Sequence, residues 1–250
     1  MDHNIVYPQN QIMEKLTDKV VFIVGATGGI GAAAAKQLHR SGAKVYITSR
    51  SVEKLNGLTA ELGLVEGRSF MLDFENESSI SSVVETILSK ESKIDILINA
   101  VGVGIIKNFE QLTVEDMRRT MQVNLLGPFM LLQAVLPSMK EQKKGLIINI
   151  PGVLGKTPMA GAAAYSASKY GLNGMMKSLR EELKRTEIRI TQLFLGGVDS
   201  PFWDTIDLRV QRDKMIISEE AGKAIWFLCQ QPTNAVVSEM VIQPFNHQAI

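Results

Sequence analysis

The chain has 250 residues and a mass of 27.5 kDa, which suits one large domain or two small ones. Its 27 basic and 26 acidic residues nearly balance, which argues against a surface built for nucleic acid, and 45% hydrophobic residues are enough for a sizeable core. One cysteine and three scattered histidines exclude a disulfide scaffold or a structural zinc site as the organising feature, and no metal ligands are predicted.

The sequence predicts neither a membrane span nor a secretory signal. No apolar run reaches the roughly 18 residues that a transmembrane helix needs. The N-terminus, MDHNIVYPQNQ, lacks a basic start followed by an apolar stretch. We therefore expect a soluble, cytoplasmic protein with no membrane and no nucleic-acid partner.

Short apolar runs alternate with helical patterns along the chain. Strands are predicted at 20–24, 45–48, 69–72, 94–99, 146–150, 188–195 and 240–242, and several are apolar at nearly every position, as in a sheet covered on both faces. Helices are predicted at 31–40, 51–62, 78–89, from 113 toward 140, from 165 onward and at 221–230. Ser51 and Ser78 are favoured N-caps, Gly42 suits a helix end, and Thr113 with Asp116 resembles a capping box.

This alternation predicts an α/β fold with right-handed crossovers. We expect a single Rossmann-type domain at 19–250, a doubly wound, mostly parallel sheet of about seven strands flanked by helices. Residues 1–18 form an N-terminal arm that is either loose or docked. Residues 196–218 are the other irregular stretch, and a loop of that length in a compact domain is usually functional, often a lid.

A glycine-rich turn follows the first predicted strand. It reads GATGGIG at 25–31 and leads into an Ala-rich helix. Glycines permit a tight turn and close approach of the backbone to a phosphate, and the helix N-terminus offers free N–H groups to a pyrophosphate. A bare turn without a ligand is the alternative, but the position after a strand and before a helix favours a dinucleotide site.

The second strand ends in Ser49 and Arg50, without an acidic residue at its tip. A carboxylate there would accept hydrogen bonds from the adenosine ribose, whereas an arginine accommodates a 2′-phosphate. The sequence therefore favours NADP(H) over NAD(H), although an exposed loop arginine is also common.

Tyr165 and Lys169 are spaced to lie on one face of a helix. A nearby ammonium favours the phenolate and lowers the pKa of a tyrosine from about 10. Tyr165 is thus predicted to exchange protons near neutral pH. By itself the spacing also occurs at an ordinary helix start.

Together these motifs resemble the short-chain dehydrogenase/reductase family over nearly the whole chain, from Lys19 to Gln243. Asp73 matches the residue that contacts adenine, and the 99–102 segment NAVG is similar to the family's Asn-Asn-Ala-Gly segment. The resemblance implies a catalytic set of Tyr165, Lys169 and Asn124, in which Asn124 orders a relay water and Lys169 also holds the ribose. With the residues above, it implies a cofactor set of Gly25, Thr27, Gly28, Gly29, Ile30, Gly31, Arg50, Asp73, Asn99, Ala100, Gly102, Tyr165, Lys169, Val198 and Ser200.

One position departs seriously from the family pattern. The catalytic serine is expected 13 residues before the tyrosine, and this position is Gly152. The loss of one pre-organised donor typically costs about 10²–10³ in rate. Three alternatives follow: a hydroxyl from Thr157 or the substrate replaces it, the enzyme is slow or specialised, or the chain binds NADP without turnover. Leu195 also replaces the usual proline of the nicotinamide turn, and Gly28 stands where a second basic residue would strengthen NADP binding.

The expected function is reversible hydride transfer between NADP(H) and a small carbonyl or alcohol compound. The rivals are a non-enzymatic NADP-binding regulator and an assembly subunit that keeps only the fold. Phe202 and Trp203 either line an apolar substrate pocket or anchor the 196–218 stretch. The family resemblance and the small residues Ala167, Gly171 and Gly174 predict a homodimer or homotetramer with close helix contacts.

Overall fold

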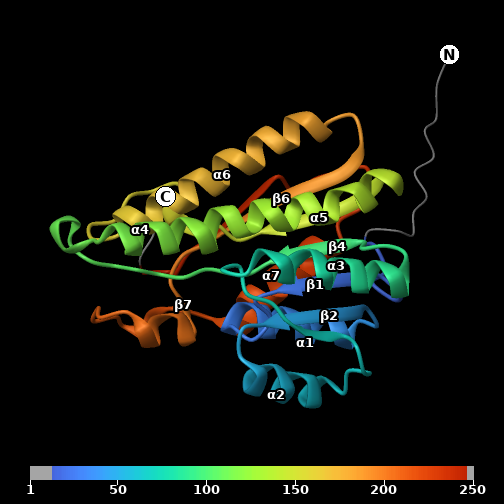
Figure 1. Cartoon of the computed structure of the whole chain (residues 1–250), viewed down its shortest axis with the longest axis horizontal. Coiled ribbons are helices and arrows are strands. Elements are labelled where there is room, and N and C mark those ends of the chain that lie inside the picture. Colours follow the sequence, from blue (N-terminus) through green and yellow to red (C-terminus); the bar gives the residue numbers. More distant parts are fainter. Residues whose placement is uncertain (1–12, 247–250) are drawn as a thin grey trace.

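A computed structural model describes residues 13–246. Seven parallel strands form the central sheet, in the order β3-β2-β1-β4-β5-β6-β9 (Figure 1). They are β1 (Val20–Val24), β2 (Lys44–Ser49), β3 (Ser69–Met71), β4 (Ile96–Asn99), β5 (Lys144–Asn149), β6 (Glu187–Leu195) and β9 (Glu239–Ile242). The Rossmann-type sheet predicted from the sequence is confirmed, with ends shifted by one or two residues.

Helices cover both faces of the sheet. On one face, α1 (Gly29–Arg40), α2 (Val52–Leu62) and α7 (Ser218–Cys229) enclose one apolar core. On the other, α3 (Glu77–Glu91), α5 (Gly127–Glu141) and α6 (Ala163–Leu183) enclose a second core, with α4 (Val114–Met121) packed against α6. In Figure 1, α5 and α6 lie in the upper part of the molecule, near β6, and α1 and α2 lie in the lower part, near β2. Burial on both faces explains why the central strands are apolar at nearly every position.

Three of the four helix-end signals predicted from the sequence are confirmed. The Ser51 hydroxyl accepts from the Lys54 N–H, Thr113 and Asp116 form a capping box, and Gly42 has φ +79° just beyond α1. Ser78 is not an N-cap. Asn76, in extended conformation, precedes α3, and Ser78 lies inside the first turn, where its hydroxyl donates to Asn76 Oδ1 at 2.9 Å.

The long helix predicted from 113 toward 140 is interrupted. A π turn at Gln122–Leu126 separates α4 from α5, and the Gly127 N–H donates to the Gln122 carbonyl five residues back. Such turns insert one residue into a helix and occur frequently at functional sites. Helical periodicity continues on both sides of the turn, which is why the sequence pattern does not reveal it.

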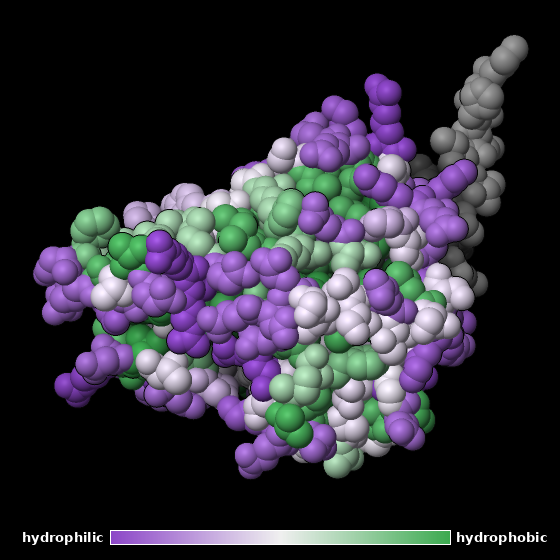
Figure 2. Space-filling view, in the orientation of Figure 1, coloured by the Kyte–Doolittle hydropathy of each residue, from purple (hydrophilic) through white to green (hydrophobic). Residues whose placement is uncertain are grey.

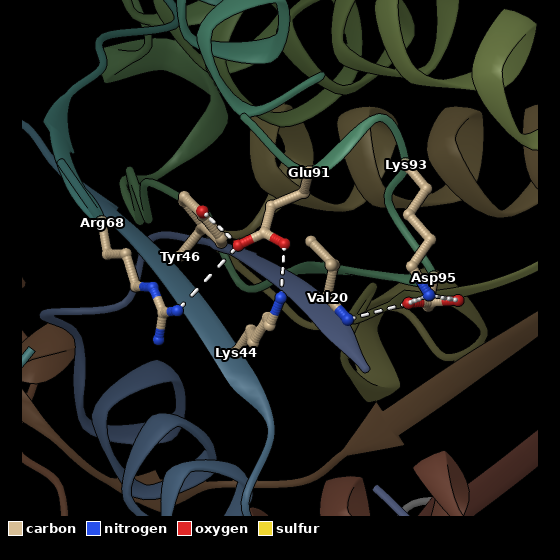
Figure 3. Close-up of polar contacts among 7 residues, drawn as sticks. All are labelled: Val20, Lys44, Tyr46, Arg68, Glu91, Lys93 and Asp95. Atoms are coloured by element: carbon tan, nitrogen blue, oxygen red, sulfur yellow. Dashed lines mark hydrogen bonds and ion pairs between the residues drawn. The ribbon is translucent and has the colours of Figure 1, made fainter. Parts of the chain in front are cut away.

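Glu91, at the end of α3, ties this helix to the amino ends of β2 and β3 (Figure 3). Its carboxylate lies 2.7 Å from Lys44 Nζ, accepts from the Tyr46 hydroxyl at 2.8 Å and lies 3.9 Å from Arg68. Burial opposes the ionised form of Glu91, but the hydrogen bonds from Lys44 and Tyr46 outweigh it and lower its pKa. Burial and the bond to Glu91 raise the pKa of Tyr46 to about 12.

The stretch predicted as irregular carries short elements. These are β7 (Val198–Asp199), a 3₁₀ turn at Pro201–Thr205, another at Arg212–Lys214, and β8 (Ile216–Ile217), which pairs with β7. We refer to residues 199–217 as the lid segment; it is the orange part labelled β7 in Figure 1. Of the predicted N-terminal arm, residues 1–12 lie outside the described residues, and Glu14 is docked through its N–H to the Gln230 carbonyl at 2.7 Å. Within 13–246, no helix is both long and apolar enough to cross a membrane.

Candidate active site

The carboxyl ends of β1, β4, β5 and β6 surround a cleft of about 820 Å³. In an open parallel sheet, ligands bind outside these ends, where the strand order reverses. Here the reversal lies between β1 and β4. The cleft is lined by the glycine turn, the loop after β4, the segment 150–159, the start of α6, and the lid segment.

The glycine turn is shaped for close backbone contacts. Gly25 has φ +80°, and a Cβ on Gly31 would lie 2.3 Å from the Gly25 carbonyl oxygen. Side chains at these positions are therefore excluded by conformation and by space. Gly28, Gly29, Ile30 and Gly31 line the cleft, and Gly28 caps α1 without a side-chain hydrogen bond. The first N–H groups of α1 are thus presented to an anion.

The predicted adenosine end lies beside the cleft rather than in its lining. Of the predicted cofactor residues, the lining lacks Gly25, Thr27, Arg50, Asp73 and Asn99 and contains the others; of the predicted catalytic residues, it lacks Asn124. The hydroxyls of Thr27 and Ser49 lie 2.6 Å apart at the carboxyl end of β2. Arg50 is half exposed, and its guanidinium lies 3.8 Å from Glu75. The sequence pattern did not predict this partner of Arg50, whose carboxylate also lies 3.5 Å from Arg119.

Tyr165 and Lys169 both begin α6 and face the cleft. Lys169 Nζ lies 5.6 Å from the centre of the Tyr165 ring, and its side chain is 2% exposed. Nζ is also 3.5 Å from the carbonyl oxygens of Val101 and Ile150, after β4 and β5. The predicted pair is therefore brought together at the centre of the site.

The electrostatics of this pair differ from the sequence-based expectation. Burial raises the pKa of Tyr165 above its ordinary value, whereas the nearby ammonium was expected to lower it. Burial also lowers the pKa of Lys169 to about 8, because an ammonium loses hydration in the interior. At neutral pH the Tyr165 phenol is protonated, so it carries the proton that reduction of a carbonyl needs, although burial makes it a weaker acid than a free tyrosine.

Asn124, in the π turn, clamps two parts of the site together. Its Oδ1 accepts from the Val103 N–H at 2.9 Å, and its Nδ2 donates to the Val103 carbonyl and to Ser168 Oγ, both at 3.0 Å. Ser168 in turn donates to the Tyr165 carbonyl at 2.7 Å. The Asn124 amide therefore fixes the loop after β4 against α6, and the predicted ordering of a relay water stays a prediction.

Gly152 lies beside the Tyr165 hydroxyl. Its φ of +70° and ψ of 167° fall in a region that is essentially restricted to glycine. A Cβ at this position would lie 3.8 Å from Tyr165 Oη and 3.6 Å from the Leu195 carbonyl oxygen, which are ordinary contacts. The space for a serine side chain is present, but the backbone conformation disfavours one. Thr157, the alternative hydroxyl, also lines the cleft.

A buried amide chain supports the turn that follows Gly152. Gln192 on β6 donates to Asn173 Oδ1 at 2.9 Å, and Asn173 donates to the Gly155 carbonyl at 3.0 Å. Gly155 in turn donates to the Gly152 carbonyl at 3.0 Å. The sequence reading missed this chain, although Asn173 lies four residues after Lys169 and so on the same helix face.

The lid segment closes the cleft on the side of the phenol. The ring of Phe202 lies 5.8 Å from the Tyr165 ring and 5.3 Å from that of Trp203. Trp203 Nε1 donates to the Val198 carbonyl at 2.9 Å. Phe202 and Trp203 therefore line the cleft and Trp203 also anchors the segment, while contact of these aromatics with a substrate stays a prediction.

Comparisons with known proteins agree with this geometry. The family model for short chain dehydrogenase matches residues 19–210. An uncharacterized oxidoreductase of Staphylococcus epidermidis is 30% identical over 232 residues, which cover 93% of this chain and all of that protein. A metagenomic short-chain oxidoreductase solved with NADP is 31% identical, with a TM-score of 0.80 over 94% of this chain and all of that one. An alcohol dehydrogenase from Thermococcus sibiricus, complexed with 5-hydroxy-NADP, is 25% identical, with a TM-score of 0.82 over 92% of this chain and 98% of that one. This chain therefore belongs to the short-chain dehydrogenase family of oxidoreductases.

Proposed function

We propose that this member of the short-chain dehydrogenase family transfers a hydride reversibly between NADP(H) and a small carbonyl or alcohol compound. The observation that carries the proposal is the Tyr165–Lys169 pair, which faces a cleft bounded by the glycine turn. The turn fits a dinucleotide, because Gly31 leaves no room for a side chain and the first N–H groups of α1 are free to bind phosphate. When bound, NADP(H) supplies or accepts the hydride.

The residues of this chain then handle the proton and the geometry. The Tyr165 phenol donates its proton to the substrate carbonyl oxygen in reduction and takes it back in oxidation. The Lys169 ammonium beside it stabilises the developing phenolate. Val198 and Ser200 line the part of the cleft that would hold the nicotinamide. Asn124 holds the loop after β4 against α6, so that these two parts of the cleft lining keep their relative positions.

Arg50 and the absence of an acid at Ser49 favour NADP(H) over NAD(H). Two similar solved structures contain NADP or a derivative of it, which supports the same choice. Arg50→Ala should reduce the ratio of the NADH to the NADPH dissociation constant. Arg185→Ala, at an exposed position in the turn after α6, is the matched control. Equal dissociation constants in the unmodified protein would contradict the assignment.

Gly152 favours a second candidate, an NADP-binding protein with little or no turnover. The position offers no side-chain donor to a substrate carbonyl. The deciding experiment measures NADPH oxidation with a broad panel of aldehydes and ketones, for the unmodified protein and for Tyr165→Phe. The enzyme assignment expects turnover that Tyr165→Phe abolishes, with NADPH affinity nearly unchanged. NADPH binding without turnover on any compound would support the regulator, and full activity of Tyr165→Phe would refute the mechanism.

A homo-oligomer is part of the proposal. Leu126, Phe129 and Tyr170, on the π turn, α5 and α6, are large side chains that are each more than 40% exposed. Figure 2 shows hydrophobic residues among hydrophilic ones over the upper part of the molecule, where Figure 1 places α5 and α6. Exposed apolar residues on neighbouring helices suit an interface with a second copy. The cytoplasmic location stays a prediction of the sequence.

A further inference from the structure

The cleft is lined by residues of one charge sign. Among the described residues that line it, none is Asp or Glu, whereas three carry positive charge: Lys169, Arg209 and Lys214. Lys169 is buried at the base, beside Tyr165. Arg209 and Lys214 come from the lid segment, and both are exposed to solvent as well as lining the cleft. A cleft lined by one sign of charge raises the local concentration of ligands of the opposite sign.

The lid segment is held in place by its third cation. Arg212 Nε lies 2.5 Å from Asp199 and Nη1 lies 2.6 Å from Asp204, while Nη2 donates to the Ser200 carbonyl at 2.9 Å. These bonds join the start of the segment to its end. They also engage two of its carboxylates, Asp199 and Asp204, with Arg212. Arg209 and Lys214 are therefore presented by a braced backbone.

The four other charged residues of the lid segment differ in whether they line the cleft. Arg209 and Lys214 line the cleft, whereas Asp207 and Asp213 do not. In the part of the chain from 13 to 246, neither Arg209 nor Lys214 takes part in an ion pair. Two cations that face the cleft without a carboxylate partner are available to an anionic ligand.

The lid segment lies against both the glycine turn and the side of the cleft that holds Tyr165. The glycine turn, where the diphosphate is expected, is flanked by the hydroxyl residues Ser200 and Ser218, whose side chains lie 2.7 and 2.5 Å from a Cβ built on Gly29. Ser200 belongs to the lid segment, so the start of the segment lies beside the glycine turn, whereas Phe202 packs against Tyr165 on the reacting side, with ring centres 5.8 Å apart. Arg209 and Lys214 are therefore available to an anionic group in addition to the phosphates expected at the glycine turn, and the NADPH measurement below distinguishes substrate from cofactor as its source.

We propose that the substrate is a carbonyl or alcohol compound that carries an anionic group, a carboxylate or a phosphate, bound by Arg209 and Lys214. Its apolar part lies against Phe202 and Met159, and its reacting oxygen faces Tyr165. This inference rests on the proposed function for the reacting end, but the anion site makes a separate claim about binding. No residue of this anion site takes part in the hydride or proton transfer.

The test compares ligands that differ only in charge. Calorimetry measures the binding of keto acids, and of the methyl ester of each, to the full chain in the presence of saturating NADP⁺. We expect at least one acid to bind and its ester to bind about tenfold more weakly or not at all. Arg209→Gln and Lys214→Gln should each weaken the acid about tenfold and leave the ester unchanged, whereas the exposed-surface controls Arg185→Gln and Lys223→Gln should change neither.

The dissociation constant of NADPH for the same variants separates the two sources of the anion. An unchanged NADPH constant together with weakened keto acid supports the substrate site. A weakened NADPH constant with unchanged keto acid binding assigns the cations to the cofactor phosphates and overturns the inference, as does the absence of discrimination between acid and ester. If acids bind with the expected pattern but no turnover occurs, the anion site stands and the proposed enzymatic function fails.

Discussion

Replacement of Gly152 by serine tests both the backbone conformation and the missing donor. At φ +70° and ψ 167°, a residue with a Cβ is strained by about 1–3 kcal/mol. The Cβ itself meets only ordinary contacts, at 3.6 and 3.8 Å, so steric overlap adds little. We therefore expect Gly152→Ser to lower the free energy of unfolding by about 1–3 kcal/mol in urea denaturation.

Gly152→Ala is the matched control, because it carries the same backbone strain without a hydroxyl. Its unfolding free energy should match that of Gly152→Ser. Any difference in NADPH oxidation between the two variants then reports the hydroxyl alone. The Cβ at position 152 lies 3.8 Å from Tyr165 Oη, so a serine hydroxyl starts close to the reacting oxygen. We expect the serine variant to be faster than the alanine variant, by at most about 10²–10³.

Two results would refute this reasoning. Wild-type stability in both variants would show that the backbone at residue 152 does not require glycine. Equal turnover of the serine and alanine variants would show that the hydroxyl does not reach the carbonyl. If the unmodified protein reduces a carbonyl efficiently and both variants slow it, glycine instead makes room for the substrate.

Three further predictions concern the base of the site, the sheet and the oligomer. Because the Lys169 ammonium loses its proton above its pKa of about 8, NADPH should bind more weakly as the pH rises through 8. An NADPH dissociation constant that stays the same up to pH 9, about one unit above that pKa, would exclude a role for the charge of Lys169 in binding. Glu91→Gln should lower the unfolding free energy at pH 7 by about 1–3 kcal/mol, and because the pKa of Glu91 is lowered in the folded state, this difference should shrink as the pH falls and the carboxylate is protonated. Glu61→Gln, at an exposed ion pair, is the control and should lower the unfolding free energy by less. Equal losses in the two variants would refute the argument. A Cβ built on Gly174 meets no other atom within 4 Å in the protomer, so Gly174→Leu should leave folding intact but dissociate the oligomer in light scattering. Gly57→Leu on α2, where a Cβ is equally unhindered, is the control and should not change the mass. An unchanged mass for Gly174→Leu would remove α6 from the interface.

The sequence was informative where a local pattern has one physical cause. Continuous apolar runs predicted the buried parallel strands, and the confirmed cap at Ser51 and capping box at Thr113 depend on bonds between near neighbours in the chain. The spacing of Tyr165 and Lys169 determined that both lie on one face of a helix. These features need no knowledge of distant segments, so the amino-acid order alone was enough to predict them.

Other features depend on groups that only the fold brings together. The π turn at Gln122–Leu126 accompanies Asn124 bonds to Val103 and Ser168, 21 and 44 residues away in sequence. The direction of the Tyr165 pKa shift is set by burial, which a count of neighbouring charges in the sequence does not contain.

The sequence by itself determined the Rossmann-type alternation, the glycine turn and the glycine at position 152, because each depends only on residue types and their spacing along the chain. Only the tertiary structure decided what these residues face. It gave Gly152 a backbone conformation essentially restricted to glycine beside Tyr165, and it directed Arg209 and Lys214, but not Asp207 and Asp213, into the cleft. The physical reason is that charge and strain act through space: their effect depends on the distances and burial that packing creates, not on separation along the chain.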